Sequence, residues 1–149
     1  MKKLSAIFFS AVMLSSVFAF ATDSDNVNAR VKASFLNDFS AATNVSWEKT
    51  SDFYFATFTI NKVEVNAAYN EEGDLVGASR TMESTQMPIS VSLALAKRYE
   101  GYTVAKKALE LTFEGDTRYY ITIANEKQIL KLKCTTNGNI EVEQKIKRK

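Results

Sequence analysis

The stretch YFATFTINKVEVNAAYNEEGDL, residues 54–75, decides the fold, because it reads as a strand, a tight turn and a second strand. Residues 53–60 and 63–69 are rich in aromatic and β-branched side chains, which favour strands. The Asn-Lys pair at 61–62 predicts a two-residue hairpin turn between them. A third strand is expected to begin near Asp74.

The same order of residue types returns 65 positions further along the chain. Residues 119–140, YYITIANEKQILKLKCTTNGNI, align with residues 54–75 without a gap. The identical pairs are Tyr54 and Tyr119, Thr57 and Thr122, Lys62 and Lys127, and Gly73 and Gly138. Agreement in apolar class and in turn position supports the alignment further, and the pattern predicts an internal repeat.

Three acidic residues surround a glycine in residues 69–77, YNEEGDLVG, which raises the question of a metal or catalytic site. The second copy keeps the glycine, because Gly73 aligns with Gly138, but its loop TTNGN has no acidic residue. Glycine supplies the positive φ that closes a hairpin loop. The first loop also lacks the alternating oxygen ligands of a calcium loop. We therefore interpret it as a turn, with a metal site and catalytic carboxylates as alternatives.

A helix is predicted in front of the first copy, over residues 25 to about 40. Apolar side chains recur there in steps of four, at Val27, Val31, Phe35 and Phe39, which forms one stripe on a helix. The candidates for the capping residue at its start are Asp23, Ser24 and Asp25.

A second helix is predicted in front of the second copy, between Pro88 in its first turn and Gly101 just after its end. We expect one apolar face made of Ile89, Leu93 and Ala96, widened by Val91, Leu95 and Tyr99. The fold class that follows is α+β, with a helix and about four antiparallel strands occurring twice, in repeats of about 25–82 and 83–147. One continuous antiparallel sheet with both helices on one face is the expected architecture.

The hairpin turn predicts which side chains share a face, because residues opposite each other across a turn point the same way. The face expected beneath the helices carries Tyr54, Ala56, Phe58, Ile60, Val63, Val65, Ala67 and Tyr69, and in the second copy Tyr119, Ile121, Ile123, Leu130, Leu132 and Cys134. Trp47 is expected in the core, with a ligand platform as the alternative. Cys134 is interpreted as a packed, inert thiol, with a redox role as the alternative.

The opposite face is mixed, with aromatic rings among charged side chains. The candidate partner-binding residues on it are Phe53, Phe55, Tyr120, Arg118, Lys131, Lys133 and Glu64. The other residues assigned to this face are Thr57, Thr59, Asn66, Thr122, Glu141, Glu143 and Lys145. Exposed rings among charges are typical of a binding surface. Cross-strand stabilisation of the sheet, or cover by a loop or a second subunit, are the alternatives.

The composition excludes several kinds of chemistry. The chain has no histidine, which excludes Ser-His and Cys-His catalysis and histidine-bearing zinc sites. It has one cysteine, so no disulfide can form within it. Without Lys2 and Lys3 the chain carries 17 basic and 17 acidic residues, which gives no electrostatic argument for nucleic-acid binding. The basic end KIKRK is interpreted as a solvated tail, with a weak anion contact as the alternative.

The chain opens with MKKLSAIFFSAVMLSSVFAFAT, in which two lysines precede an uncharged, largely apolar run over residues 4–18. This predicts a signal peptide of residues 1–21, cut after Ala21 in the sequence AFA. The run is short for a membrane span, and a retained N-terminal helix is the alternative. Residues 22–149 are then expected to form one exported domain, with no membrane span after cleavage. A periplasmic location is the first expectation and secretion the second.

Two segments carry further motifs. Residues 44–80 have a Trp, then a strand with the pattern aromatic-Tyr-x-Ala-x-Phe, then a Tyr before an acidic Gly turn. Residues 87–110 have a Pro-started helix that ends in Tyr-x-Gly-Tyr. Together these segments resemble the PepSY-like proteins of Gram-negative periplasms. The resemblance covers about residues 27–147; Met87 stands where the family more often has Leu. It implies a fold similar to β-lactamase-inhibitor protein, a concave open face, export and no cofactor.

Three functions are compatible with these observations. The first is a non-enzymatic exported module that binds, and through fold analogy inhibits, a peptidase or another envelope protein. The second is a small-ligand carrier or small enzyme with a cone-shaped α+β fold. The third is an envelope structural protein that associates with itself through an edge strand or the open face.

Overall fold

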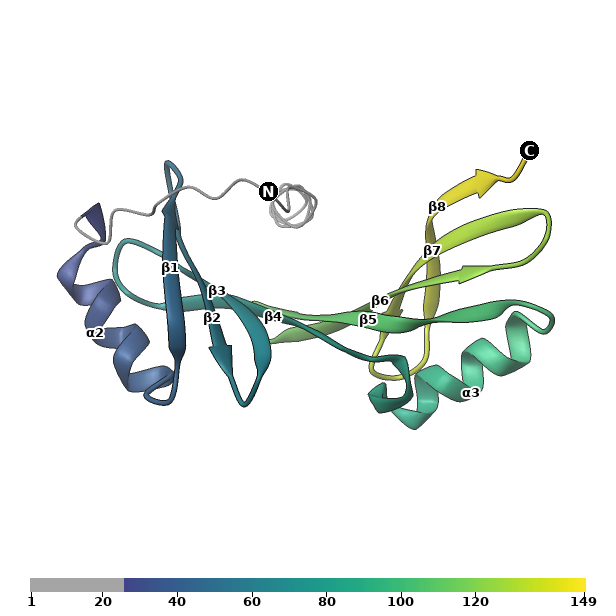
Figure 1. The fold of residues 1–149 in the computed structure, drawn as a ribbon, viewed down its shortest axis with the longest axis horizontal. Coiled ribbons are helices and arrows are strands. Elements are labelled where there is room, and N and C mark those ends of the chain that lie inside the picture. The colour runs from purple at the N-terminus through teal and green to yellow at the C-terminus, as the bar shows by residue number, and fades with distance from the viewer. Residues whose placement is uncertain (1–25) are drawn as a thin grey trace.

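A computed structural model describes residues 26–149 as one eight-stranded antiparallel sheet with two α-helices (Figure 1). The strands follow the order of the chain from β1 to β8, so each pairs with its neighbours in sequence. The elements are α2 (Ala29–Asp38), β1 (Thr43–Lys49), β2 (Tyr54–Ile60), β3 (Val63–Tyr69), β4 (Leu75–Glu83), the short 3₁₀ helix η2 (Ser84–Gln86), α3 (Ile89–Arg98), β5 (Thr103–Phe113), β6 (Asp116–Ala124), β7 (Gln128–Thr135) and β8 (Ile140–Lys147). The signal peptide predicted over residues 1–21 lies outside the described residues.

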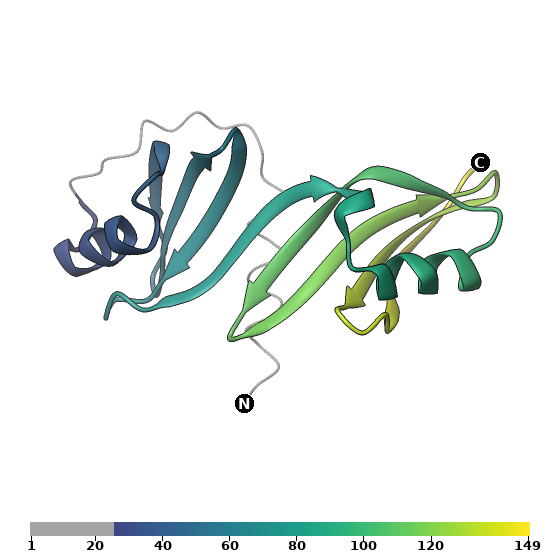
Figure 2. The same ribbon diagram turned by 90° about the horizontal axis from the view of Figure 1, so that it is seen from below.

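Both helices cover the same face of the sheet, and β4 links the two halves (Figures 1 and 2). In β4, Ala78 lies opposite Ala67 of the half covered by α2, and Met82 lies opposite Ala108 of the half covered by α3. Alternate residues of a strand point to one side, so Ala78 and Met82 share a face. The expectation of α+β architecture with helices on one side is confirmed. The opposite side is called the open face below.

The sheet bends between its halves, so that the open face is the inner side of the curve (Figure 1). In Figure 1 the strands of the first half stand upright beside α2, while the long strands β4 and β5 run across to the second half above α3. Side chains on the inner side of a bend converge. This geometry brings residues of β2, β5 and β6 close to one another on the open face.

The apolar stripe of α2 packs on β1, β2 and β3, and its phase was predicted correctly. Val31 and Phe35 are buried, and Phe39 packs against the same cluster. The buried members of this first core are Val27, Val31, Phe35, Trp47, Tyr54, Ala56, Phe58, Ala67 and Tyr69. The Tyr69 hydroxyl donates to Asp38 Oδ2 at 3.0 Å, which ties the last turn of α2 to β3. Trp47 belongs to this core, as expected.

The cap of α2 differs from the expectation. Asn28 is the capping residue, and its Oδ1 accepts a hydrogen bond from the backbone N–H of Arg30 at 2.8 Å. The helix therefore begins at Ala29, later than predicted, and Asp23, Ser24 and Asp25 lie outside the described residues. Asn28 also donates from Nδ2 to the carbonyl of Glu71, so the cap joins the helix to the loop after β3.

The expectation for α3 was right about its limits and wrong about part of its face. Val91 and Leu95 are buried, whereas Ile89 and Leu93 are 73% and 62% exposed. The buried stripe runs in steps of four through Met87, Val91, Leu95 and Tyr99. This short helix has two apolar stripes, one with Ile89 and Leu93 and one with Val91 and Leu95. The stripe that continues from Met87 packs on the second half of the sheet.

The two hairpins have the predicted register. Ile60 lies opposite Val63 across a turn in which Asn61 and Lys62 both have positive φ, of 50° and 66°. In the second half Tyr119 lies opposite Cys134, and Ile121 opposite Leu132. The predicted apolar face therefore lies beneath the helices in both halves, except that Val63, at the hairpin turn, is 37% exposed and was wrongly expected to be covered.

The acidic loop is a turn. Gly73 has a φ of +86°, and Asn70 N–H donates to the Asp74 carbonyl at 3.1 Å. The loop between β7 and β8 repeats this arrangement, because Gly138 has a φ of +82° and Thr135 N–H donates to the Asn139 carbonyl at 2.9 Å.

Both outer strands are irregular. The pairing of β1 shifts between Thr43 and Ser46, and the pairing of β8 shifts where Lys131 lies opposite Gln144 while Leu132 lies opposite Val142. A bulge of this kind moves every later side chain to the other face. Lys145 consequently lies opposite the core residue Leu130, on the helix side. Its assignment to the open face was wrong.

Cys134 is fully buried, as the packed-thiol interpretation requires. Burial raises the pKa of its thiol to about 11. The native thiol should therefore react slowly with iodoacetamide, and its rate should stay low between pH 7 and pH 9. In urea the rate should rise about tenfold per pH unit below the ordinary thiol pKa of about 8.5, because the thiolate is the nucleophile. Rapid native alkylation that follows the urea profile would contradict this burial.

Candidate functional site

The aromatic residues predicted for the open face do gather there. Phe53, Phe55 and Tyr120 belong to one apolar cluster, which also contains Ala68, Val76, Leu111 and Phe113. The rings of Phe53 and Phe55 are 6.4 Å apart between centroids, close to edge-on. This cluster joins β2 and β3 of the first half to β5 and β6 of the second.

One of the predicted contact residues is deeper than expected. Phe55 is only 9% exposed, whereas Phe53 and Tyr120 are half-buried. The period-two pattern gave the correct side for Phe55, but curvature then packs it with Ala68 and Leu111. Phe55 is therefore part of a small second core, and Phe53 and Tyr120 are the accessible rings.

Two of the four predicted charged residues, Arg118 and Lys133, form ion pairs. Arg118 Nη2 pairs with Asp116 at 3.2 Å. Lys133 Nζ pairs with Glu141 at 2.8 Å and lies 3.9 Å from Glu143. These pairs border Tyr120, whose backbone lies opposite Lys133.

The other two predicted charged residues lie outside these pairs. Lys131 is exposed, next to Thr122 in the register, and makes no ion pair within 4.0 Å in residues 26–149. Glu64 is exposed opposite Thr59, near the tip of the first hairpin, so the structure does not bring it to the others.

The charges affect one another's protonation. The hydrogen bond from Lys133 lowers the pKa of Glu141, and the same bond raises the pKa of Lys133. The pKa of the Tyr120 phenol is raised, first by burial and then by the negative charge of Glu143. All three groups therefore keep their ordinary charge states at neutral pH: an ammonium, a carboxylate and a neutral phenol.

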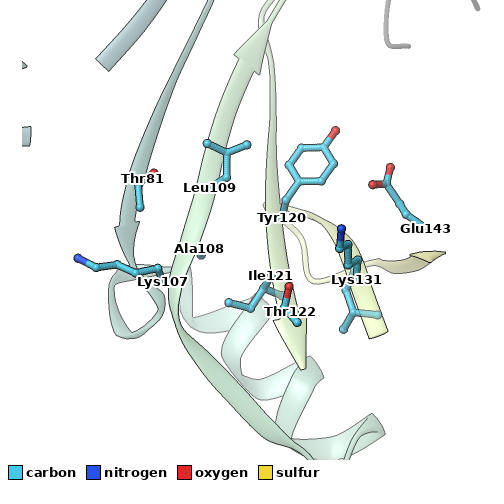
Figure 3. A pocket seen from close by; sticks show the side chains of 10 residues that line it. Thr81, Lys107, Ala108, Leu109, Tyr120, Ile121, Thr122, Lys131 and Glu143 are labelled. Carbon is cyan, nitrogen blue, oxygen red and sulfur yellow. The ribbon is translucent and has the colours of Figure 1, made fainter. Parts of the chain in front are cut away.

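A hollow of about 310 Å³ lies on the open face of the second half, called the β4–β8 hollow below (Figure 3). Residues that line it include Thr81, Lys107, Leu109, Tyr120, Thr122 and Lys131, with Glu143 on the β8 side. In Figure 3 Lys107 extends away from Tyr120 and Lys131. Its Nζ pairs with Glu83 at 2.5 Å.

The sequence alone did not point to three of these residues. Thr81, Lys107 and Leu109 belong to β4 and β5, whose pairing joins the two predicted repeats. The repeat alignment compares the two copies residue by residue, so it does not predict contacts between one copy and the other. Alternation along residues 103–113 was the available signal, since Lys107, Leu109 and Leu111 occupy alternate positions.

The side chains on the open face are of kinds that can contact another molecule. No group of three or more acidic, cysteine or histidine side chains in residues 26–149 could hold a metal ion. Within the same residues, no helix is long and apolar enough to cross a lipid bilayer. The open face presents half-buried rings, hydroxyl groups and charges, which suit recognition of a polar and partly apolar surface.

Comparison with known proteins identifies the fold. No protein-family model and no curated protein matches the chain. A BLIP-like protein from Bacteroides fragilis superposes with a TM-score of 0.68 at 16% identity, over 85% of this chain and 94% of its own. A DUF2874 family protein from Bacteroides uniformis has a TM-score of 0.66 at 18% identity, with 81% and 89% of the two chains covered.

A protein from Bacteroides eggerthii described as a candidate periplasmic protein is also similar. Its TM-score is 0.65 at 17% identity, with 81% of this chain and 88% of that chain covered. At such identities the likeness shows the fold alone. The expectation of a fold similar to β-lactamase-inhibitor protein is supported by the BLIP-like neighbour.

Proposed function

We propose that this protein is a non-enzymatic exported module that binds another envelope protein through the open face. The observation that carries the proposal is the half-buried ring of Tyr120. It joins the apolar cluster on one side and borders the β4–β8 hollow on the other. Rings beside paired charges provide contact area at low entropic cost and are typical of interface centres.

The periplasm is the proposed location, and the PepSY-like proteins are the proposed family. The N-terminal pattern ending in AFA supports export, as does the fold neighbour described as a candidate periplasmic protein. A fold without an internal disulfide must take its stability from apolar packing, and the two cores beneath the helices provide that packing. Inhibition of an enzyme is one form that binding can take, by analogy with the BLIP-like neighbour.

The chain is also proposed to be an internal duplication. A Cβ on Gly73 would approach Arg30 and Ser34 of α2, and a Cβ on Gly138 would approach Ser90 of α3. Positions 30 and 90 are 60 residues apart, which is the spacing between the apolar stripes of the two helices. Equivalent turns therefore meet equivalent helices, which supports two copies of one helix-and-sheet unit.

Cross-linking in living cells tests the binding function. A photoreactive benzoylphenylalanine at position 120 should give a discrete adduct with one envelope protein, identified by mass spectrometry. The matched control carries the same group in place of Leu93, which is 62% exposed on the outer side of α3. Adding Phe53→Asp to the position-120 variant should abolish the adduct. Equal adducts at both positions, or none at position 120, would contradict binding through the open face.

A further inference from the structure

The positive charges on the open face of the second half are not equally compensated. Four cations lie there on β5, β6 and β7: Lys107, Arg118, Lys131 and Lys133. Three of them have a carboxylate within 3.2 Å, from Glu83, Asp116 and Glu141 respectively. Lys131 has none within 4.0 Å in the described part of the chain. It is the uncompensated cation of the β4–β8 hollow.

Hydroxyl groups gather beside Lys131. Thr122 lies directly opposite it in the register, and Thr81 and Tyr120 line the same hollow. Within residues 26–149, the side-chain hydrogen bonds found include none from these three hydroxyls. One ammonium and three hydroxyls can thus donate to a ligand that brings oxygen acceptors.

The hollow is also small and partly apolar. Leu109 and the Tyr120 ring form its wall, and its volume of about 310 Å³ is at the lower end of ligand pockets. That space suits one or two amino-acid side chains. Glu143 on the β8 side makes the site unfavourable for a polyanion and leaves an acceptor for a peptide N–H.

We propose that the β4–β8 hollow is the anchor site for an acidic residue of the partner protein, an Asp or Glu next to an apolar side chain. The carboxylate pairs with Lys131 and accepts from Thr122, while the apolar neighbour packs on Leu109 and Tyr120. The assignment follows from charge complementarity and rests on the function proposed above. It names the chemistry by which the open face recognises its partner.

Two blocked peptides test the anchor site, because their only difference is one charge. The probes are acetyl-Gly-Phe-Asp-Gly-amide and its Asn counterpart, titrated into the isotope-labelled protein and followed by NMR. The Asp peptide should shift the amide signals of Tyr120, Thr122 and Lys131. The Asn peptide should bind about fivefold more weakly, as expected for the loss of a partly exposed ion pair.

Two matched variants assign that difference to Lys131. Lys131→Gln should make the two peptides bind equally, because the charge that discriminates between them is gone. Lys97→Gln, in the exposed last turn of α3, should preserve the fivefold difference. Equal affinity of both peptides for the unmodified protein would overturn the proposal. So would the absence of shifts at several millimolar Asp peptide, or shifts confined to other elements.

The two proposals can fail separately. A position-120 adduct with peptides that do not discriminate would mean that the open face binds its partner without an acidic anchor. Peptide discrimination without any adduct would mean that the hollow binds carboxylates but the binding function in the envelope is wrong.

Discussion

Replacing Phe35 with alanine is expected to lower the free energy of unfolding by about 3–5 kcal/mol, the range for a large aromatic residue removed from a core. Phe35 is 3% exposed, and its ring centroid lies 5.1 Å from that of Trp47 and 5.0 Å from that of Phe58. The substitution removes the contacts of the Phe35 ring with the sheet and leaves a cavity between α2 and the strands. Urea unfolding followed by far-ultraviolet circular dichroism measures the loss.

The adjacent residue is the control for this prediction. Leu36 belongs to the same helix but is 65% exposed, so Leu36→Ala should change the free energy of unfolding by less than about 0.5 kcal/mol. If the two variants are equally stable, α2 does not depend on this packing for its place on the sheet.

Replacing Gly138 with alanine is expected to cost about 3 kcal/mol, from two causes that can be separated. Its φ of +82° lies in the left-handed region, which costs a residue with a Cβ about 1–2 kcal/mol. An added Cβ would also lie 2.6 Å from the carbonyl oxygen of Ser90 in the first turn of α3. That oxygen is backbone, so either the turn or the helix must move.

Two other glycines isolate the contribution of the close contact. Gly115 has a φ of +83° with no atom within 4 Å of an added Cβ, so Gly115→Ala should cost only about 1–2 kcal/mol. A Cβ on Gly73 would meet side-chain atoms of Arg30 and Ser34 at 3.0 Å and the carbonyl oxygen of Arg30 at 3.3 Å. The backbone contact is looser than the 2.6 Å contact at Gly138, so the cost should be intermediate. Thermal unfolding of the three variants should place them in that order. Equal losses would show that backbone conformation alone matters.

The hairpin at 54–69 could be predicted because two independent signals agreed. The turn at 61–62 fixed which residues lie opposite each other, and the apolar alternation fixed which side is buried. The same reasoning extended to residues 119–134, where Tyr119 lies opposite Cys134 as expected. This reasoning alone placed Phe53 and Tyr120 on the same face, and the structure shows both in one apolar cluster.

Other features depend on contacts that alternation does not contain. The buried face of α3 was ambiguous because Ile89 and Leu93 are as apolar as Val91 and Leu95. The depth of Phe55 follows from the bend of the sheet, which period-two reasoning treats as flat. These errors concern curvature and the choice between two apolar stripes.

Only part of the candidate site could be predicted from the sequence. Tyr120 and Lys131 were identified, but the wall opposite them comes from β4 and β5, which meet between the predicted repeats. The side of Lys145 depends on the bulge in β8, and a bulge is decided by how the strand pairs with β7.

The irregular outer strands make it unfavourable for a partner to bind by adding a strand to the edge of the sheet. Asn44 in β1 has a φ of 53°, and β8 carries a bulge and lysines, so neither border presents a straight row of free backbone groups. An incoming polypeptide would find no regular template on which to add a ninth strand. Under the proposed binding function, selectivity for a partner would then come from side chains of the open face and not from backbone pairing at a sheet edge.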